Sequence, residues 1–321
     1  MTATSRDKLR NIAIIAHVDH GKTTLVDAML KQTGVFHAHE VIKDRVMDSG
    51  DLERERGITI LAKHASVRWG DYKINIIDTP GHADFGGEVE RILRMADGAL
   101  LLVDAAEGAL PQTRFVLGKS IELGMPVIVV INKIDRKDAR PDEALTETFD
   151  LFCDLGASDE QTDFPTIYAI GKEGIAKRKL TDETTDLSAL FETIVERIPA
   201  PSEPVDAPLQ ILVHNTVHDE YIGKVAIGRV RAGRVERNQQ VMLIGAEKSM
   251  LAKVSNLFTF EKTDRVVSDG AYAGDIIALS GIDQVEIGDT LADPANPVAL
   301  ARIAVEEPTI RVRFLINTSP F

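Results

Sequence analysis

A short segment between residues 16 and 23 combines residue types that suit phosphate binding. Gly21 has no side chain, so neighbouring backbone N–H groups can approach phosphate oxygens, while Lys22 can neutralise charge and Thr23 offers a hydroxyl to Mg²⁺. An apolar run over residues 11–16 precedes the segment and a helical pattern follows, so the helix adds its positive end. The alternative is an ordinary glycine turn before a helix. We expect phosphate contacts from Asp19, His20, Gly21, Lys22, Thr23 and Thr24.

A second group of polar residues follows the apolar run over residues 72–78. Asp78 ends this run, where a carboxylate packs poorly but is well placed to hold a metal-bound water. Gly81 can present its N–H to a γ-phosphate, and His82 would lie beside an attacking water. Thr59, further upstream, is expected as a second hydroxyl ligand of Mg²⁺. The segment could form a plain turn, but after a phosphate loop it indicates a sensor of the γ-phosphate.

A third group, Asn132, Lys133 and Asp135, follows an apolar run over residues 127–131. An aspartate can accept from two guanine N–H donors at once, and adenine offers no such pair. Leaving such buried polar partners unpaired costs about 1–3 kcal/mol each, which is enough for specificity. Lys133 can lay its stem along the base. The alternative is a charged helix cap at Asp135. Together, the three groups indicate a switch that binds GTP and GDP and hydrolyses GTP.

Buried strands must bring these groups together. Short apolar runs are typical of parallel strands covered on both faces. Two runs joined at residues 70 and 71 predict a hairpin, and hence one antiparallel edge strand. The alternation with helices predicts an α/β P-loop GTPase domain over residues 1–200, doubly wound and mostly parallel, with its site at the carboxyl ends of the strands. The expected strands are 11–16, 62–69, 72–78, 98–104, 126–132 and 166–169, and the expected helices are 23–30, 111–123, 141–155 and 187–198.

The pattern changes after a proline-rich linker at residues 199–204. Short strands separated by Gly, Asn and Asp turns, without a helix-length pattern, indicate a small antiparallel β-barrel over residues 201–305. Asn238 is expected to adopt a positive φ in one of the turns. A further strand pattern leads us to expect the start of a third domain at residues 306–321. The expected strands of the barrel are 209–214, 223–230, 240–244, 251–257 and 275–279.

Composition excludes several classes of protein. The net charge of −13 is spread over both halves, so neither half has the basic surface of a nucleic-acid-binding domain. Apolar runs are too short to cross a bilayer, and residues 1–8 lack the apolar core of a signal peptide, so no membrane partner is expected. Cys153 is the only cysteine, which excludes an intrachain disulfide and fits a reducing, cytoplasmic setting.

The motifs resemble those of the translational GTPases, and within them the ribosome-associated BipA/TypA type, over essentially the whole chain. The resemblance implies a GTPase that binds the ribosome, through rRNA and ribosomal proteins, and that is linked to large-subunit assembly and stress adaptation. It also implies further C-terminal domains, which would make most of the ribosome contacts. The matching segments are residues 14–25, 46–49, 51–53, 55–60, 78–87, 111–115, 132–136, 139–141, 164–165 and 168–169.

The resemblance also implies roles for individual residues. His82 resembles the histidine that orients the hydrolytic water, and Val18 and Ile58 resemble the hydrophobic gate through which that histidine passes. Asp19 resembles a carboxylate that helps to hold a monovalent cation such as K⁺. The barrel resembles the second domain of elongation factors, which docks on the small ribosomal subunit. Residues 170–171 depart from the family, which has Ser-Ala where this chain has Ile-Gly, so the supporting serine hydroxyl is lost and lower nucleotide affinity is expected.

The same motifs are compatible, to different degrees, with three alternatives to a BipA/TypA-type GTPase. A sister factor of the LepA or elongation-factor-G type would share these motifs. A nucleotide-gated assembly scaffold would use hydrolysis only to reset itself. A P-loop metabolic kinase would share the phosphate loop, but it leaves the group at residues 132–135 unexplained.

Overall fold

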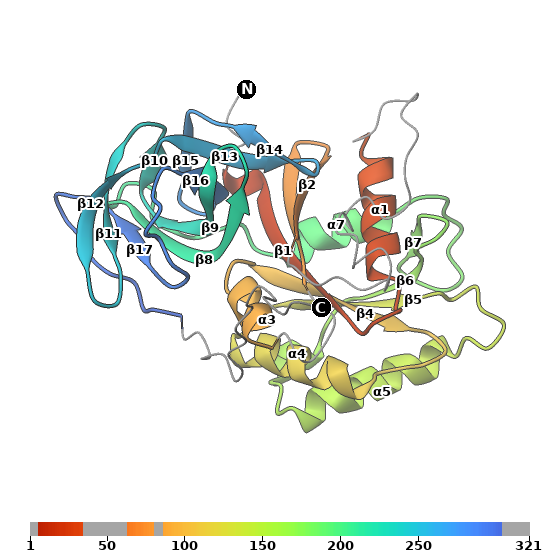
Figure 1. Cartoon of the computed structure of the whole chain (residues 1–321). Helices are drawn as coiled ribbons and strands as arrows, with labels where there is room; N and C mark the ends of the chain where they lie inside the picture. Colours follow the sequence, from red (N-terminus) through yellow and green to blue (C-terminus); the bar gives the residue numbers. More distant parts are fainter. Residues whose placement is uncertain (1–5, 35–62, 80–85, 304–321) are drawn as a thin grey trace, which may run out of the picture.

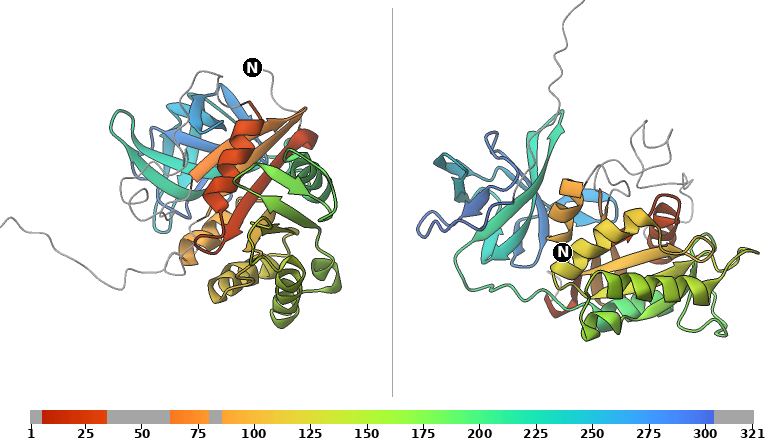
Figure 2. Two further views of the ribbon diagram at one scale, coloured as in Figure 1. Left: turned by 90° about the vertical axis from the view of Figure 1, so that its right-hand side faces the viewer. Right: turned by 90° about the horizontal axis from the view of Figure 1, so that it is seen from below.

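The structure is a computed structural model that describes residues 6–34, 63–79 and 86–303 of the 321-residue chain. Figure 1 shows two folded units side by side, a layered α/β unit and a unit made of strands. The two views of Figure 2 show the same arrangement from other directions. Within the described residues, no helix is long and apolar enough to cross a membrane.

A seven-stranded sheet forms the centre of the first unit, in the order β2-β3-β1-β4-β5-β6-β7. The inner strands pair in parallel, and β2 pairs with β3 in the antiparallel sense through the turn at residues 70 and 71. This confirms the expected antiparallel edge strand, and β7 adds a second one at the opposite edge. The strands are β1 (Leu9–Ala16), β2 (Lys63–Trp69), β3 (Tyr72–Asp78), β4 (Gly98–Asp104), β5 (Val127–Asn132), β6 (Thr166–Ile170) and β7 (Ile175–Lys177).

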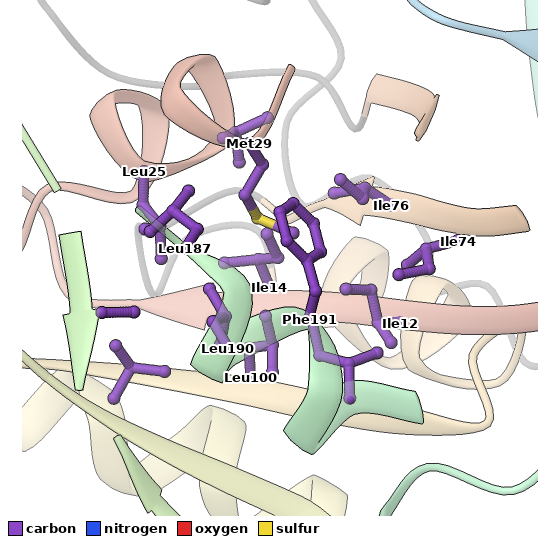
Figure 3. Close-up of a cluster of buried hydrophobic side chains, with 14 of the residues drawn as sticks. Ile12, Ile14, Leu25, Met29, Ile74, Ile76, Leu100, Leu187, Leu190 and Phe191 are labelled. Carbon is purple, nitrogen blue, oxygen red and sulfur yellow. The ribbon is translucent and has the colours of Figure 1, made fainter. Parts of the chain in front are cut away.

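Helices cover both faces of this sheet, as a doubly wound fold requires. On one face, α1 (Lys22–Gln32) and α7 (Ser188–Arg197) pack on alternate residues of the strands, and Figure 3 shows Leu25, Met29 and Phe191 within this cluster. On the other face lie α3 (Gly86–Leu93), α4 (Pro111–Glu122) and α5 (Pro141–Asp154). Two short helices, η1 (Arg6–Lys8) and α6 (Asp159–Thr162), complete the unit. The central strands are buried throughout, which explains their unbroken apolar sequences.

The second unit is entirely antiparallel among its described strands. An eight-stranded sheet in the order β12-β11-β17-β8-β9-β16-β13-β14 and a two-stranded ribbon, β10-β15, enclose an apolar core. The expected strand over residues 251–257 was wrong in one respect, because the chain ends one strand at Lys253 and begins another at Asn256. The strands are β8 (Gln210–Asp219), β9 (Gly223–Ala232), β10 (Arg234–Glu236), β11 (Gln240–Ile244), β12 (Ser249–Lys253), β13 (Asn256–Glu261), β14 (Asp264–Val267), β15 (Gly270–Tyr272), β16 (Ile276–Ser280) and β17 (Thr290–Ala292).

The two units share a continuous, partly apolar interface. Ile77, Ile92 and Met95 of the α/β unit join one buried cluster with residues of β9, β13 and β16. A polar group also crosses the interface, because the Asn11 side chain donates to the carbonyl of Gly274 at 3.0 Å; the same side chain donates to Asp97 within its own unit at 2.8 Å. Strand β3, which leads towards the proposed nucleotide site, therefore packs directly against the β unit.

Candidate nucleotide-binding site

The loop between β1 and α1 has the backbone geometry of a phosphate loop. Asp19 and Gly21 both have positive φ, 65° and 93°, so the loop turns sharply before the helix begins at Lys22. A Cβ atom on Gly21 would lie only 2.5 Å from Nδ2 of Asn132, so the close approach of these two segments requires glycine. The backbone N–H groups of the first turn of α1 are thereby directed to the carboxyl edge of the sheet, where an anion would bind.

Lys22 joins the phosphate loop to the end of β3. Its side chain is buried, and its ammonium group lies 3.1 Å from Oδ1 of Asp78 and donates to the carbonyl of Thr79. The Thr79 hydroxyl in turn donates to the carbonyl of Ile14 at 2.7 Å, which fixes the segment that follows β3 against β1. A buried carboxylate beside a buried ammonium is the pairing expected where both groups serve a charged ligand.

Asn132 links three loops. Its Nδ2 donates to the carbonyl of His20 in the phosphate loop at 2.9 Å, and its Oδ1 accepts the backbone N–H of Gly171 at 3.0 Å. The side chain is 1% exposed, so both hydrogen bonds are shielded from water. The backbone N–H of Gly171 therefore already has a partner. The side chain of Asn132 thus joins the phosphate loop to the loop after β6.

Lys133 lies between the phosphate loop and Asp104. The lysine has a positive φ of 60°, and its Nζ donates to the carbonyl of Asp19 at 2.6 Å and to Oδ2 of Asp104 at 2.7 Å. Arg136 reaches the same oxygen at 3.1 Å. Burial alone would raise the pKa of Asp104, but hydrogen bonds from Lys133 and Ala106 and the nearby cationic charges lower it overall. Asp104 is therefore an anion that orders two cations.

His20 is completely buried beneath the phosphate loop. Its Nδ1 lies 3.2 Å from the carbonyl oxygen of Leu102 and 3.4 Å from the amide nitrogen of Asp104, and its Nε2 lies 3.7 Å from Glu107. Burial is the main reason that the pKa of His20 is lowered, so the ring is neutral at pH 7. The side chain thus supports the loop from below, and the backbone N–H of His20 donates to the carbonyl of His17 at 3.3 Å.

Asp135 and Thr24 are exposed, the first just after β5 and the second in the first turn of α1. Asp135 is exposed in the turn after β5, which is anchored by the N–H of Ile134 donating to the carbonyl of Ala169 at 3.4 Å. A cavity of about 460 Å³ lies between α1 and the loop after β6. Its lining residues are Thr24, Asp27, Ala28, Lys31, Gln32, Gly171, Lys172, Glu173 and Gly174. The cavity therefore extends along α1 from the phosphate loop.

The residues present fit a magnesium ion. Asp78 is a fully buried carboxylate at the end of β3, and Thr23 supplies a hydroxyl at the start of α1. Hard oxygen donors of this kind, completed by waters and phosphate oxygens, are what Mg²⁺ prefers. Asp78 is held close to the phosphate loop by Lys22. The donor set thus agrees with the Mg²⁺ dependence general to P-loop GTPase domains.

The structure brings most of the predicted site residues to one edge of the sheet. The contacts are pairwise: Lys22 with Asp78, Asn132 with His20, and Lys133 with Asp19. Thr23 and Thr24 lie in the first turn of α1, and Val18 is half-buried in the loop. Ile58, Thr59, Gly81 and His82 lie outside the described residues. Sequence analysis missed Asp104, Glu107 and Arg136. A signal was present, because Asp104 ends an apolar run in the same way as Asp78 and Asn132.

Comparison with known proteins agrees with this geometry. Residues 7–200 match the family described as "Elongation factor Tu GTP binding domain", and residues 223–292 match "Elongation factor Tu domain 2". The chain is 52% identical over 316 residues to the large ribosomal subunit assembly factor BipA of Salmonella typhimurium, covering 98% of this chain and 52% of that protein. It is 53% identical over 317 residues to a chloroplastic TypA-like elongation factor of Arabidopsis thaliana, covering 98% of this chain and 47% of the relative.

A BipA of Haemophilus influenzae is 51% identical over 316 residues, again with 98% of this chain and 51% of the relative covered. The chain thus spans about half the length of the relatives that it matches. The first family match alone covers well over half of the chain, and the residues that carry it form the site described above. The chain therefore belongs to the family of elongation factor Tu-type GTP-binding proteins, and within it to the BipA/TypA-type translational GTPases.

Proposed function

We propose that this chain binds GTP and hydrolyses it to GDP and phosphate as a conformational switch. The observation that carries this proposal is the link made by Asn132, which ties the phosphate loop to the loop after β6 where a purine-reading site would lie. A kinase reading leaves this link, together with Lys133 and Asp135, without a role. Residues 1–200 would form the GTP-binding domain, residues 201–305 the barrel domain, and residues 306–321 the start of a third.

Catalysis in such a site is mostly positioning and charge neutralisation. Lys22 would neutralise the β- and γ-phosphates, and Thr23, Thr59 and Asp78 would hold Mg²⁺, which supplies further neutralisation of charge when bound. His82 would orient the attacking water, as the family resemblance suggests. None of the three nucleotide motifs contains an arginine, so slow intrinsic turnover is expected, since comparable switches turn over at about 10⁻⁴ s⁻¹ without their activator.

We further propose that the ribosome is the partner and activator. Two relatives are named as large ribosomal subunit assembly factors, and the β unit matches a domain of an elongation factor. The proposed role of this chain is in ribosome assembly, translation and stress adaptation. The proposal also includes a K⁺ ion beside Asp19 and a cytoplasmic location. A sister translational factor is the main alternative, and a scaffold that uses hydrolysis only as a reset is the second.

Calorimetry with GTP, GDP and ATP tests the nucleotide class. We expect binding of GTP and GDP and at least a hundred-fold weaker binding of ATP, because adenine leaves the carboxylate of Asp135 without its two donors. Replacing that carboxylate by an amide, Asp135→Asn, should shift the preference towards xanthine nucleotides. Equal affinity for GTP and ATP in the parent chain would contradict the proposal.

Single-turnover release of phosphate, with and without purified ribosomes, tests the partner. Ribosomes are expected to stimulate hydrolysis strongly, since activators of related switches accelerate them by up to ~10⁵. The variant His82→Ala should retain GTP binding but lose the stimulation. A hydrolysis-deficient variant that still supports subunit assembly would favour the scaffold alternative.

A further inference from the structure

Asp104 is a buried acidic residue that the three nucleotide motifs do not include. It ends β4 at the same edge of the sheet as the phosphate loop, and it is 0% exposed. Its Oδ1 accepts the backbone N–H of Ala106 at 2.8 Å, and its Oδ2 faces Lys133 and Arg136 at 2.7 and 3.1 Å. A buried carboxylate is unfavourable unless it is paired, so these contacts stabilise the charged form of Asp104, and Asp104 in turn orders Lys133 and Arg136.

Lys133 transmits the position of Asp104 to the phosphate loop. The same ammonium group that meets Asp104 also donates to the carbonyl of Asp19 at 2.6 Å. Asp19 and Lys133 both have positive φ, a conformation that a non-glycine residue holds only when its surroundings fix it. The two strained residues thus hold one another across the site, and Asp104 anchors the lysine that joins them.

Arg136 provides a second connection to the same loop. Besides Asp104, its guanidinium contacts Glu107 at 3.5 Å and Asp138 at 2.8 Å. Glu107 in turn approaches Nε2 of the buried His20 at 3.7 Å. Asp104 therefore lies between the loop that would read the base and the loop that would hold the phosphates. Its carboxylate contacts the first loop directly and the second through Lys133, and its backbone N–H lies 3.4 Å from Nδ1 of His20.

We propose that Asp104 is a positioning residue for the bound nucleotide, which holds Lys133 against the phosphate loop without touching the nucleotide itself. This inference rests on the proposed binding of GTP. Holding both loops in place before the nucleotide arrives raises affinity, because less ordering remains to be done on binding. Two other roles predict different results: a carboxylate acting only by its charge would repel the phosphates, and a purely structural residue would affect stability alone.

The variant Asp104→Asn separates these roles. The amide oxygen can still accept the N–H of Ala106, whereas the negative charge that orders Lys133 and Arg136 is lost. With the full chain, we expect the dissociation constant for a fluorescent GDP to rise about ten-fold, mainly through faster dissociation, and KM for GTP to rise by more than kcat falls. Ten-fold corresponds to about 1.4 kcal/mol. Unchanged affinity, or tighter binding through relief of charge repulsion, would overturn the proposal.

Asp138→Asn is the matched control, since it removes a carboxylate from the exposed side of Arg136 and leaves Asp104 with both cations. It should change the dissociation constant by less than two-fold. The second variant, Arg136→Met, removes a half-buried guanidinium and leaves the Asp104 carboxylate paired with Lys133. Asp104 would still hold Lys133, and we expect at most a three-fold change. A ten-fold change would assign the effect to Arg136 and overturn the proposed link.

A double-mutant cycle with Lys133→Met tests the route of the effect. If Asp104 acts through Lys133, the double variant should bind GDP within two-fold of Lys133→Met alone. Independent effects that multiply would contradict the proposal. A parent chain that binds no GDP would refute the proposed function itself, whereas a parent that binds GDP as tightly as Asp104→Asn would refute only the inference about Asp104.

Discussion

Gly21 occupies a position where even a methyl group has no room. Its φ of 93° is unfavourable for any L-residue, and a Cβ would lie 2.5 Å from Nδ2 of Asn132. Gly21→Ala should therefore displace Asn132 from the carbonyl of His20 and open the link between the loops. We expect the affinity for GDP to fall at least ten-fold, measured by calorimetry, because the backbone strain of about 1–2 kcal/mol and the lost hydrogen bond act together.

Gly34 offers a control with the same type of backbone strain. It has a φ of 69°, and among the described residues no atom lies within 4 Å of an added Cβ. Gly34→Ala should lower stability by a comparable strain energy and leave nucleotide affinity within two-fold of the parent. If both variants weaken GDP binding equally, general backbone strain rather than the contact with Asn132 would be responsible.

At this scale, the sequence identified residues whose types carry chemistry and missed those that act through neighbours. Lys22, Asn132 and Lys133 were expected at the site because their chemistry suits a nucleotide, and the structure places them together. Asp104 was missed because its role depends on which side chains meet it across the sheet edge. The distances between such side chains are set by tertiary packing, so they cannot be predicted from a single sequence without its fold.

The edge strand β2 is covered by the β unit. The N–H of Ser66 donates to the carbonyl of Lys262 at 2.7 Å, and the Ser66 hydroxyl donates to the carbonyl of Phe260 at 2.9 Å. Pairing of this kind removes an exposed sheet edge. His64, on the same strand, stacks on the ring of Phe260 at 4.7 Å between centroids. Among the described residues, neither of its ring nitrogens has a hydrogen-bond partner.

The buried His64 should make the free energy of unfolding sensitive to acid. Burial lowers the pKa of His64 to about 4, against an ordinary value of 6.5. Below pH 6.5 the unfolded chain therefore binds a proton that the folded chain does not, so the free energy of unfolding falls as pH falls. His64→Leu removes this titration, and between pH 7.5 and 5 it should lose about 2 kcal/mol less than the parent. Urea denaturation at both pH values measures the difference.

The exposed His218, on β8 of the β unit, provides a control. His218→Gln removes one exposed histidine, and a change in the pH dependence as large as that of His64→Leu would show that the effect does not depend on the buried position of His64. His214 is also buried, and its pKa is lowered to about 3, first by burial and then by the charge of Arg231, so a substantial acid sensitivity should remain in His64→Leu. A variant with the full sensitivity of the parent would show that His64 is not buried as described.

Elements with strong local signals were predicted well. The positive φ of Asn238 and the hairpin at residues 70 and 71 are confirmed, as are the buried parallel strands, because turn chemistry and unbroken apolar runs are local properties. Helix α3 and strands β7, β10, β14, β15 and β17 were missed. These elements are short, with three to eight residues, and they are stabilised by the sheet or domain that they pack against rather than by their own pattern.

At the scale of the whole molecule, buried ions join the two units. Arg229 of β9 is 2% exposed, and its guanidinium contacts Asp97 at 2.5 Å, Glu203 at 2.7 Å and the carbonyl of Met95 at 2.7 Å. Arg231 reaches Glu203 at 3.3 Å and the carbonyl of Arg94. Because Met95 and Asp97 follow α3, these contacts join the β unit to the C-terminal end of that helix.

Arg229→Met should weaken this connection between the units. The aliphatic side chain fills much of the space but leaves Asp97 and Glu203, whose side chains are only 12% exposed, without the cation that they share. Breaking a buried ion pair typically costs about 3–5 kcal/mol. We expect unfolding at pH 7.5 to begin at a lower urea concentration and to separate into two transitions, one for each unit. Circular dichroism measures both transitions. Arg234→Met, at an exposed ion pair with Glu236, is the control and should change stability by less than about 0.5 kcal/mol.

The loss in Arg229→Met should also depend on pH in a defined direction. Burial raises the pKa of Asp97, and the charge and hydrogen bond of Arg229 oppose this rise. In the variant the contributions of Arg229 are gone and the hydrogen bond from Asn11 remains, so the pKa of Asp97 rises further and the folded state takes up a proton as the pH falls. Uptake by the folded state stabilises it relative to the unfolded chain. The deficit of Arg229→Met relative to the parent should therefore shrink between pH 7.5 and 5.5, and a deficit that grows on acidification would rule out an unpaired buried carboxylate as its cause.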